Sequence, residues 1–200
     1  MDNFVYLASQ SPRRRQLLEQ LGVCYELLLP DANEDAEALE VVLKNEAPAA
    51  YVKRVTRLKL SAAFMRLKQR QLKDGPILCS DTTVALGRTI YGKPKDADDA
   101  ARMLGELSGQ THRVLTSVAL HSEQQLYEGF SSSRVSFESM TAQQISAYVS
   151  TGEPMGKAGS YAVQGRAAAY ISRINGSYSG IMGLPLCETS SLLRRAGLKI

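Results

Sequence analysis

The stretch "GPILCSDTTVALG" (75–87) has the composition of a central strand, yet it contains a charged residue. It is rich in β-branched residues and bounded by glycines, a pattern typical of a strand. Asp81 interrupts the apolar run, and a carboxylate inside a sheet is costly unless it is paired, hydrogen-bonded or bound to metal. One interpretation is an aspartate at a strand end that accepts hydrogen bonds from its neighbours. The other is a functional group, which we favour because Lys93 follows after a predicted turn and can return beside it.

Helices and strands are predicted on both sides of this strand. The other expected strands are 4–8, 25–29, 112–122, 126–138 and 167–174. The expected helices are 12–22, 48–70, 96–108, one beginning near 141, and 185–197. Strands alternate with helices early and follow one another later, which indicates an α/β fold with a mixed sheet. No repeat or linker divides the chain, so we expect a single domain, 1–200. Its length also suits two lobes that share one core.

The first predicted helix carries three consecutive arginines, in "SPRRRQLLEQLG" (11–22), where its first turn should lie. Ser11 is a good N-cap and Pro12 a good first helical residue. Cations are unfavourable at this end because of its free N–H groups and the helix dipole. Either the arginines simply point into water, or an anion belongs there.

Composition limits the class of protein. Hydrophobic residues make up 44% and charged residues 22% of the 200 residues, the balance of an ordinary globular protein. Three widely spaced cysteines argue against a disulfide framework or a zinc site and fit a reducing compartment. Cys24 and Cys79 have apolar neighbours, which indicates core positions for both. The chain lacks a signal peptide and a run of about 18 apolar residues, so we expect a cytoplasmic protein without a membrane partner.

Positive charge is concentrated between residues 47 and 73, where no Asp or Glu occurs. The basic residues are Lys53, Arg54, Arg57, Lys59, Arg66, Lys68, Arg70 and Lys73. The stretch is either the solvated face of an amphipathic helix or a surface that faces phosphates. The net charge of +4 allows a polyanionic partner without demanding one.

Several common catalytic arrangements are poorly supported. The two histidines, His112 and His121, lie in predicted strands, where a structural role is the simpler interpretation. No His or Cys cluster could hold zinc. The segment "GRTIYGK" is not a P-loop, because its glycine spacing and final Ser or Thr are missing.

Five blocks, in order along nearly the whole chain, resemble the Maf family of nucleoside triphosphate pyrophosphatases. They are "LASQSPRRRQLLEQLG", "SDTTV" followed by "GKPKD", "LSGQTHRVLTSVAL", "KAGSYAVQG" and "INGSYSGIMGLPL". The resemblance implies a bilobal α/β fold related to inosine triphosphatases, with a central mixed sheet flanked by helices and a deep cleft, often in a homodimer. It also implies hydrolysis of a nucleoside triphosphate to the monophosphate and pyrophosphate with a divalent cation, Mg²⁺ or Mn²⁺.

The same resemblance implies roles for particular residues. Asp81 matches the catalytic acidic residue that accepts a proton from water, and Glu34 matches a carboxylate that helps to hold the metal with Asp81. The positions that match polar and cationic groups of the cleft, expected to bind phosphate, are Ser9, Ser11, Arg13, Arg14, Lys59 and Lys93.

Three positions separate the substrate classes of the family, and here they are Arg13, Thr82 and Gln164. This combination is similar to the branch that acts on dTTP and UTP, whereas the branch that acts on 7-methyl-GTP tends to carry an aromatic residue, Gln and Glu. The amide of Gln164 offers a donor and an acceptor, as the O4 and N3–H edge of a pyrimidine requires.

The chain departs from the family pattern at Leu58, which stands where a glutamate usually precedes the helix lysine, and at the additional Arg15. Two other functions compete with the enzyme. One is a regulatory protein that senses nucleotide in the same cleft. The other is a nucleic-acid binder that uses residues 47–73, although only Tyr51 and Phe64 could stack with bases there.

Overall fold

The computed structural model describes residues 4–31, 34–35 and 38–200, and its centre is one mixed sheet. The strand order is β2-β1-β3-β5-β6-β7, with β4 beside β3. The strands are β1 (Phe4–Leu7), β2 (Cys24–Leu27), β3 (Ile77–Leu86), β4 (Thr89–Tyr91), β5 (Thr111–Ser122), β6 (Gln125–Phe137) and β7 (Ile171–Asn175). β1 runs parallel to β2 and β3, and the remaining pairs are antiparallel, which confirms the predicted mixed α/β sheet.

Strand β3 is fully paired along one edge and interrupted along the other. β5 pairs with it from Ile77 to Ala85. On the opposite edge, β1 pairs only with Ile77 and Leu78, and β4 only from Val84 to Leu86. Among the described residues, no strand pairs with this edge between residues 79 and 83, and Asp81 lies in the middle of the gap.

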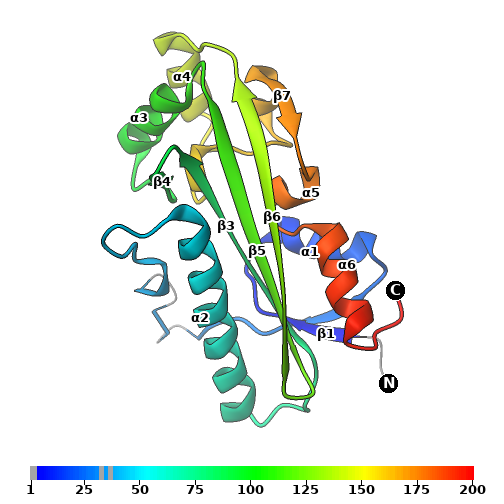
Figure 1. Ribbon diagram of the computed structural model, residues 1–200. Helices are drawn as coiled ribbons and strands as arrows, with labels where there is room; N and C mark the ends of the chain where they lie inside the picture. The colour runs from blue at the N-terminus through cyan, green and yellow to red at the C-terminus, as the bar shows by residue number, and fades with distance from the viewer. Residues whose placement is uncertain (1–3, 32–33, 36–37) are drawn as a thin grey trace.

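Helices cover both faces of the sheet (Figure 1). They are α1 (Pro12–Gln20), α2 (Pro48–Gln69), α3 (Ala97–Leu107), α4 (Ala142–Val149), α5 (Tyr178–Met182) and α6 (Leu186–Arg195), with short 3₁₀ turns η1 (Ala38–Glu40), η2 (Ala158–Ser160) and η3 (Arg166–Tyr170). None of the helices that the structure describes is long and apolar enough to cross a membrane.

Alternation along β3 divides its side chains between two layers. Cys79 packs in a cluster with Leu60 and Leu67 of α2. Leu78 packs on the other face with Leu17 of α1 and Leu192 of α6. Odd-numbered residues of β3 therefore face α2, and even-numbered residues face the layer that contains α1 and α6.

A separate core lies at the opposite end of the long strands. It joins Val84, Val114 and Val135 of the sheet to Leu104 of α3 and Tyr148 of α4. One sheet runs through both cores, so we retain the prediction of a single domain, 1–200, whose two lobes share a cleft.

Some predicted helices and strands differ from those in the structure. Residues 167–174 were expected to be one strand, but η3 precedes β7 within that range. Helix α5 and strand β4 were not predicted. All three cysteines are free, as expected, but Cys24 is exposed on the edge strand β2, whereas its apolar neighbours had indicated a core position.

Gly159 provides a test of the packing between η2 and β3. Its φ is +68°, and an added Cβ would lie 2.8–2.9 Å from the side chain of Val84. Gly87 also has a positive φ, +60°, but no atom within 4 Å of such a Cβ. We expect Gly87→Ala to cost about 1 kcal/mol through its backbone conformation alone. Gly159→Ala should cost about 3 kcal/mol, because overpacking is added.

Denaturant unfolding of both variants measures this difference. Equal losses of unfolding free energy would contradict the described contact between Gly159 and Val84.

Candidate active site

A cavity of about 790 Å³ opens at the gap in the edge of β3. Its walls come from the loop after β1, from α2, from β3, and from the turns around residues 155–164 and 181–183. All of the sequence-predicted site residues line it: Ser9, Ser11, Arg13, Arg14, Glu34, Lys59, Asp81, Thr82, Lys93 and Gln164. The fold thus brings segments from most of the chain to one place.

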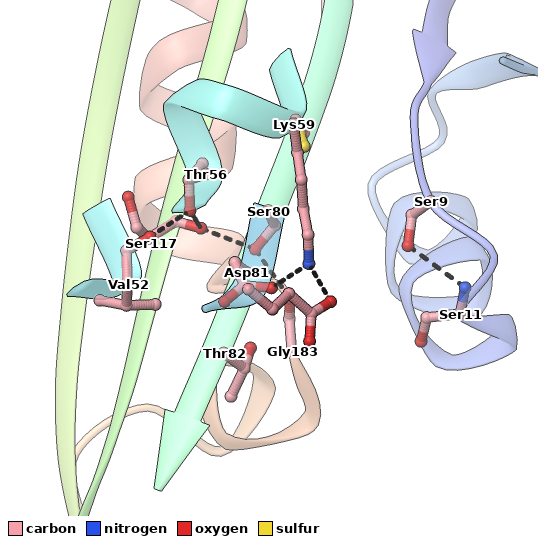
Figure 2. A network of polar contacts seen from close by, with 12 residues as sticks. Ser9, Ser11, Val52, Thr56, Lys59, Ser80, Asp81, Thr82, Ser117 and Gly183 are labelled. Atoms are coloured by element: carbon pink, nitrogen blue, oxygen red, sulfur yellow. Dashed lines mark hydrogen bonds and ion pairs between the residues drawn. The ribbon is translucent and has the colours of Figure 1, made fainter. Parts of the chain in front are cut away.

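Asp81 is held by a lysine from α2. Lys59 Nζ lies 2.6 Å from Asp81 Oδ1, and the exposed fractions of the two side chains are 19% and 10% (Figure 2). The same ammonium group lies 2.7 Å from Glu40 Oε1. Lys59 therefore supplies the cation that a buried carboxylate requires, and the charge of Asp81 is compensated without a metal.

Burial alone would lower the pKa of Lys59, but the adjacent carboxylates of Asp81 and Glu40 raise it above its ordinary value. The ammonium group consequently stays protonated throughout the neutral range. Lys59 is therefore a fixed positive charge beside Asp81.

Ser80 and Thr82, the neighbours of Asp81, form hydrogen bonds on the opposite face of β3. Ser80 Oγ donates to the carbonyls of Ser117, at 2.8 Å, and Gly183, at 2.9 Å (Figure 2). Thr82 Oγ1 lies 3.0 Å from the hydroxyl of Thr116. These bonds join β3 to β5 and to the turn after α5, so the strand around Asp81 is fixed on both faces.

The three arginines of α1 have different environments. Arg14 donates to the Gly183 carbonyl at 2.7 Å, to Ser9 Oγ at 3.1 Å and to Thr82 Oγ1 at 3.5 Å. It therefore links the loop after β1, strand β3 and the turn after α5. Arg15, in contrast, donates to the carbonyl of Gln10 at 3.4 Å, just outside the turn.

Arg13 is the arginine that remains available to a ligand. Its Nε donates to the Met182 carbonyl over a long distance, 3.4 Å. Burial and the charge of Arg14 both lower its pKa. Burial and the charge of Arg13 likewise lower the pKa of Lys157, which also lines the cavity. An anion between these cations would relieve their repulsion, which favours the anion-binding interpretation of the helix start.

Glu34 lies on the cleft wall but is engaged by a different cation. Both of its carboxylate oxygens accept from Arg66, at 2.8 and 2.6 Å. These hydrogen bonds lower the pKa of Glu34 to about 2. The two carboxylates that were predicted to share a metal, Glu34 and Asp81, are thus each paired with a separate basic side chain of α2.

The basic stretch of residues 47–73 is largely neutralised by carboxylates from elsewhere. The ion pairs are Arg54 with Glu46, Arg57 with Glu128, Lys59 with Glu40 and Asp81, Arg66 with Glu34, Lys68 with Asp74, and Arg70 with Asp31. Lys53 lies over the ring of Phe130, 4.6 Å from its centroid. This pairing removes the sequence argument for an extended phosphate-binding surface and favours the amphipathic-helix interpretation.

The histidines lie in structural surroundings, as the sequence indicated. His112 is buried, and its Nε2 lies 2.8 Å from the hydroxyl of Tyr161. Burial lowers its pKa to about 4, so its ring is neutral near pH 7. His121 packs against the ring of Phe64 at a centroid distance of 4.8 Å.

Glu40 and Lys157 are cleft residues that the sequence prediction did not include. Glu40 lay in an acidic loop that carried no signal for a particular partner. Lys157 lay in the glycine-rich "GEPMGKAGSY", which was weak evidence alone because glycines also form ordinary turns. The structure places both side chains on the wall of the cavity.

The comparisons with known proteins agree with one another over the whole chain. The family described as "Maf-like protein" matches residues 4–196. A dTTP/UTP pyrophosphatase of Albidiferax ferrireducens is 66% identical over all of both chains. Another, from a Polaromonas species, is 68% identical over 99% of this chain and 98% of its own. A third, from Cupriavidus pinatubonensis, is 60% identical over all of both chains.

Among solved structures, the Ham1 protein of Staphylococcus aureus aligns with 68% of this chain and 71% of its own. Its sequence identity is 12% and its TM-score 0.39, too low to argue from.

The different environments of the arginines predict different effects of their removal. Arg14→Ala should lower the free energy of unfolding by about 2 kcal/mol, because it deletes charge-assisted hydrogen bonds in a partly buried place. Arg15→Ala, the matched control, should change it by less than about 0.5 kcal/mol. Arg13→Ala should leave stability near that of the wild type, because its removal relieves repulsion, but should weaken nucleotide binding.

Denaturant unfolding and calorimetric nucleotide titration separate these effects. A loss of stability in Arg13→Ala equal to that in Arg14→Ala would refute the assignment of Arg14 as the structural link.

The pair between Glu34 and Arg66 predicts a dependence of stability on pH. The folded-state pKa of Glu34, about 2, lies below its ordinary value of 4.5, so its contribution is complete above pH 4.5 and is lost as pH falls towards 2. We expect Glu34→Gln to destabilise the protein at pH 7 by about 1 kcal/mol, after allowance for solvent screening.

Urea unfolding of both proteins between pH 7 and the acid limit of folding measures this difference. The difference in unfolding free energy between the wild type and Glu34→Gln should decrease steadily below pH 4.5. A difference that is constant with pH would show that the ion pair is not its cause.

Proposed function

Because this chain belongs to the Maf-like protein family, we infer that it hydrolyses dTTP and UTP to the nucleoside monophosphate and pyrophosphate. The single observation that carries this inference is the convergence of the predicted residues on one cleft, around the Asp81–Lys59 pair. The names of the relatives supply the substrates.

The cationic part of the cleft suits the triphosphate. Arg13 lies at the N-terminal end of α1, close to the N–H groups that the first turn leaves unbonded. Lys93 and Lys157 lie on other parts of the wall. Hydrolysis of a phosphoanhydride depends mainly on positioning and on neutralisation of the charge that develops on the leaving group. We assign these cations to that task.

We assign the activation of the attacking water to Asp81. In the proposed step, the water oxygen bonds to the α-phosphorus while its proton passes to the Asp81 carboxylate. The bond from the α-phosphorus to the bridging oxygen breaks, and that oxygen leaves with the pyrophosphate. Lys59 holds the carboxylate in place through the 2.6 Å contact.

The donor set of the cleft suits a metal that is held partly by the substrate. Within the described residues, no group of three or more His, Cys, Asp or Glu side chains could hold a metal ion without further ligands. Mg²⁺ commonly uses one or two carboxylates together with substrate phosphates, and Asp81 and Glu34 line the cleft as oxygen donors. We propose these two residues as its protein ligands. A bound Mg²⁺ or Mn²⁺ would neutralise phosphate charge there.

Recognition of the base is assigned to the part of the wall that contains Gln164. Gln164 is exposed there, and its amide can pair with the O4 and N3–H edge of a pyrimidine. Thr82 contributes indirectly, because its hydroxyl accepts from Arg14 and contacts Thr116. Homodimer formation, a cytoplasmic location and the lack of a nucleic-acid partner stay predictions.

The substrate assignment is tested by pyrophosphate release from dTTP, UTP, CTP, GTP and 7-methyl-GTP, with and without Mn²⁺. We expect metal-dependent release from dTTP and UTP. Release mainly from 7-methyl-GTP would overturn the roles of Arg13, Thr82 and Gln164. Binding of nucleotide without release from any of them would favour the regulatory sensor instead.

A further inference from the structure

The carboxylate of Glu40 contacts two lysines that reach the cleft from different elements. Its Oε1 lies 2.7 Å from Nζ of Lys59, on α2, and 3.2 Å from Nζ of Lys93, in the loop after β4. Neither Glu40 nor this contact was expected from the sequence. One carboxylate oxygen therefore joins two cations that the proposed function assigns to the active site.

The position of Glu40 is set by the helix on which Lys59 lies. The hydroxyl of Tyr51, a buried residue of α2, donates to the backbone carbonyl of Glu40 at 3.0 Å. The helix itself has no acidic residue, and Leu58, beside Lys59 in sequence, brings no charge and is 39% exposed. The carboxylate that pairs with Lys59 therefore comes from Glu40 in η1. The hydrogen bond from Tyr51 holds this turn against α2.

These contacts join four charged side chains. Glu40 and Asp81 contribute two negative charges, and Lys59 and Lys93 two positive charges. Lys59 is shared between the two carboxylates at nearly equal distances, 2.7 and 2.6 Å. Without Glu40, Lys59 would be left with Asp81 alone, and Lys93 would lose this contact. One of the two carboxylates near Lys59 would then be gone, and both lysines would keep their positive charge.

We propose that Glu40 is a positioning residue that shares Lys59 with Asp81 and occupies Lys93 until the triphosphate enters. It acts through the two lysines and not on the substrate. Because phosphates must displace Glu40 from Lys93, the residue weakens binding of the anion. Because it shares Lys59 with Asp81, it helps to fix the ammonium group that holds the Asp81 carboxylate in place. This proposal rests on the proposed function of the cleft.

The test compares Glu40→Gln and Glu40→Asp with Glu46→Gln. Glu46 is the matched control, because it pairs with Arg54 of the same helix at 2.6 Å but does not line the cleft. For Glu40→Gln we expect kcat for dTTP to fall roughly tenfold and KM to fall as well, since a charge-assisted contact and a competing anion are both lost. Glu40→Asp should restore part of kcat, and Glu46→Gln should leave both constants unchanged.

A binding measurement without metal or turnover accompanies the kinetics. Calorimetric titration with inorganic tripolyphosphate should show Glu40→Gln binding roughly threefold tighter than the wild type, because an anion has been removed. Unchanged or weaker binding would overturn the proposal. So would an unchanged kcat, or a rise in KM at constant kcat, because Glu40 would then only stabilise the fold or contact the substrate directly.

The two proposals fail differently. If the wild type released no pyrophosphate from dTTP or UTP, the proposed function would fail. The tripolyphosphate titration would still decide whether Glu40 competes with phosphate for the lysines.

Discussion

The ion pair between Lys59 and Asp81 is the constraint on which the rest of the cleft depends. A carboxylate in the middle of a buried strand is tolerated only with a partner, and here the partner is an ammonium group on α2. This requires α2 to pack along the face of β3 to which Asp81 points. The edge of β3 beside Asp81 is also open, because the pairings of β1 and β4 with β3 are short. Packing on the face of β3 therefore stabilises the charge, and the short pairings at its edge leave space for the cavity.

Strand alternation then gives the two sides of the cleft different tasks. Asp81 faces α2 and the cluster of lysines and carboxylates. Ser80 and Thr82 face the other layer, where they bind the turn after α5 and, through Thr82, Arg14. The proposed base and the residues that support the strand are thus adjacent along the chain. Residues of both faces line the cavity at the gap in the sheet edge.

Local signals predicted much of this structure, and long-range pairing accounts for what they missed. Ser11 and Pro12 marked the start of α1 correctly, because an N-cap is a property of adjacent residues. The blocks of the family resemblance named residues that do line one cleft. The partners of the basic stretch were not predictable, since Glu128 lies 71 positions from Arg57 and Glu40 lies 19 from Lys59. Cys24 was misplaced because edge position in a sheet is decided by strand order and not by neighbouring residues.

The claim that Asp81 is the base is tested most directly by Asp81→Asn, which keeps the shape of the side chain and removes its charge. Single-turnover hydrolysis of dTTP and calorimetric binding of a non-hydrolysable dTTP analogue should be measured on the same folded preparation. The account predicts that the hydrolysis rate constant falls roughly 10²- to 10⁴-fold while the analogue still binds. A rate constant within about tenfold of the wild type, with the analogue bound normally, would contradict it.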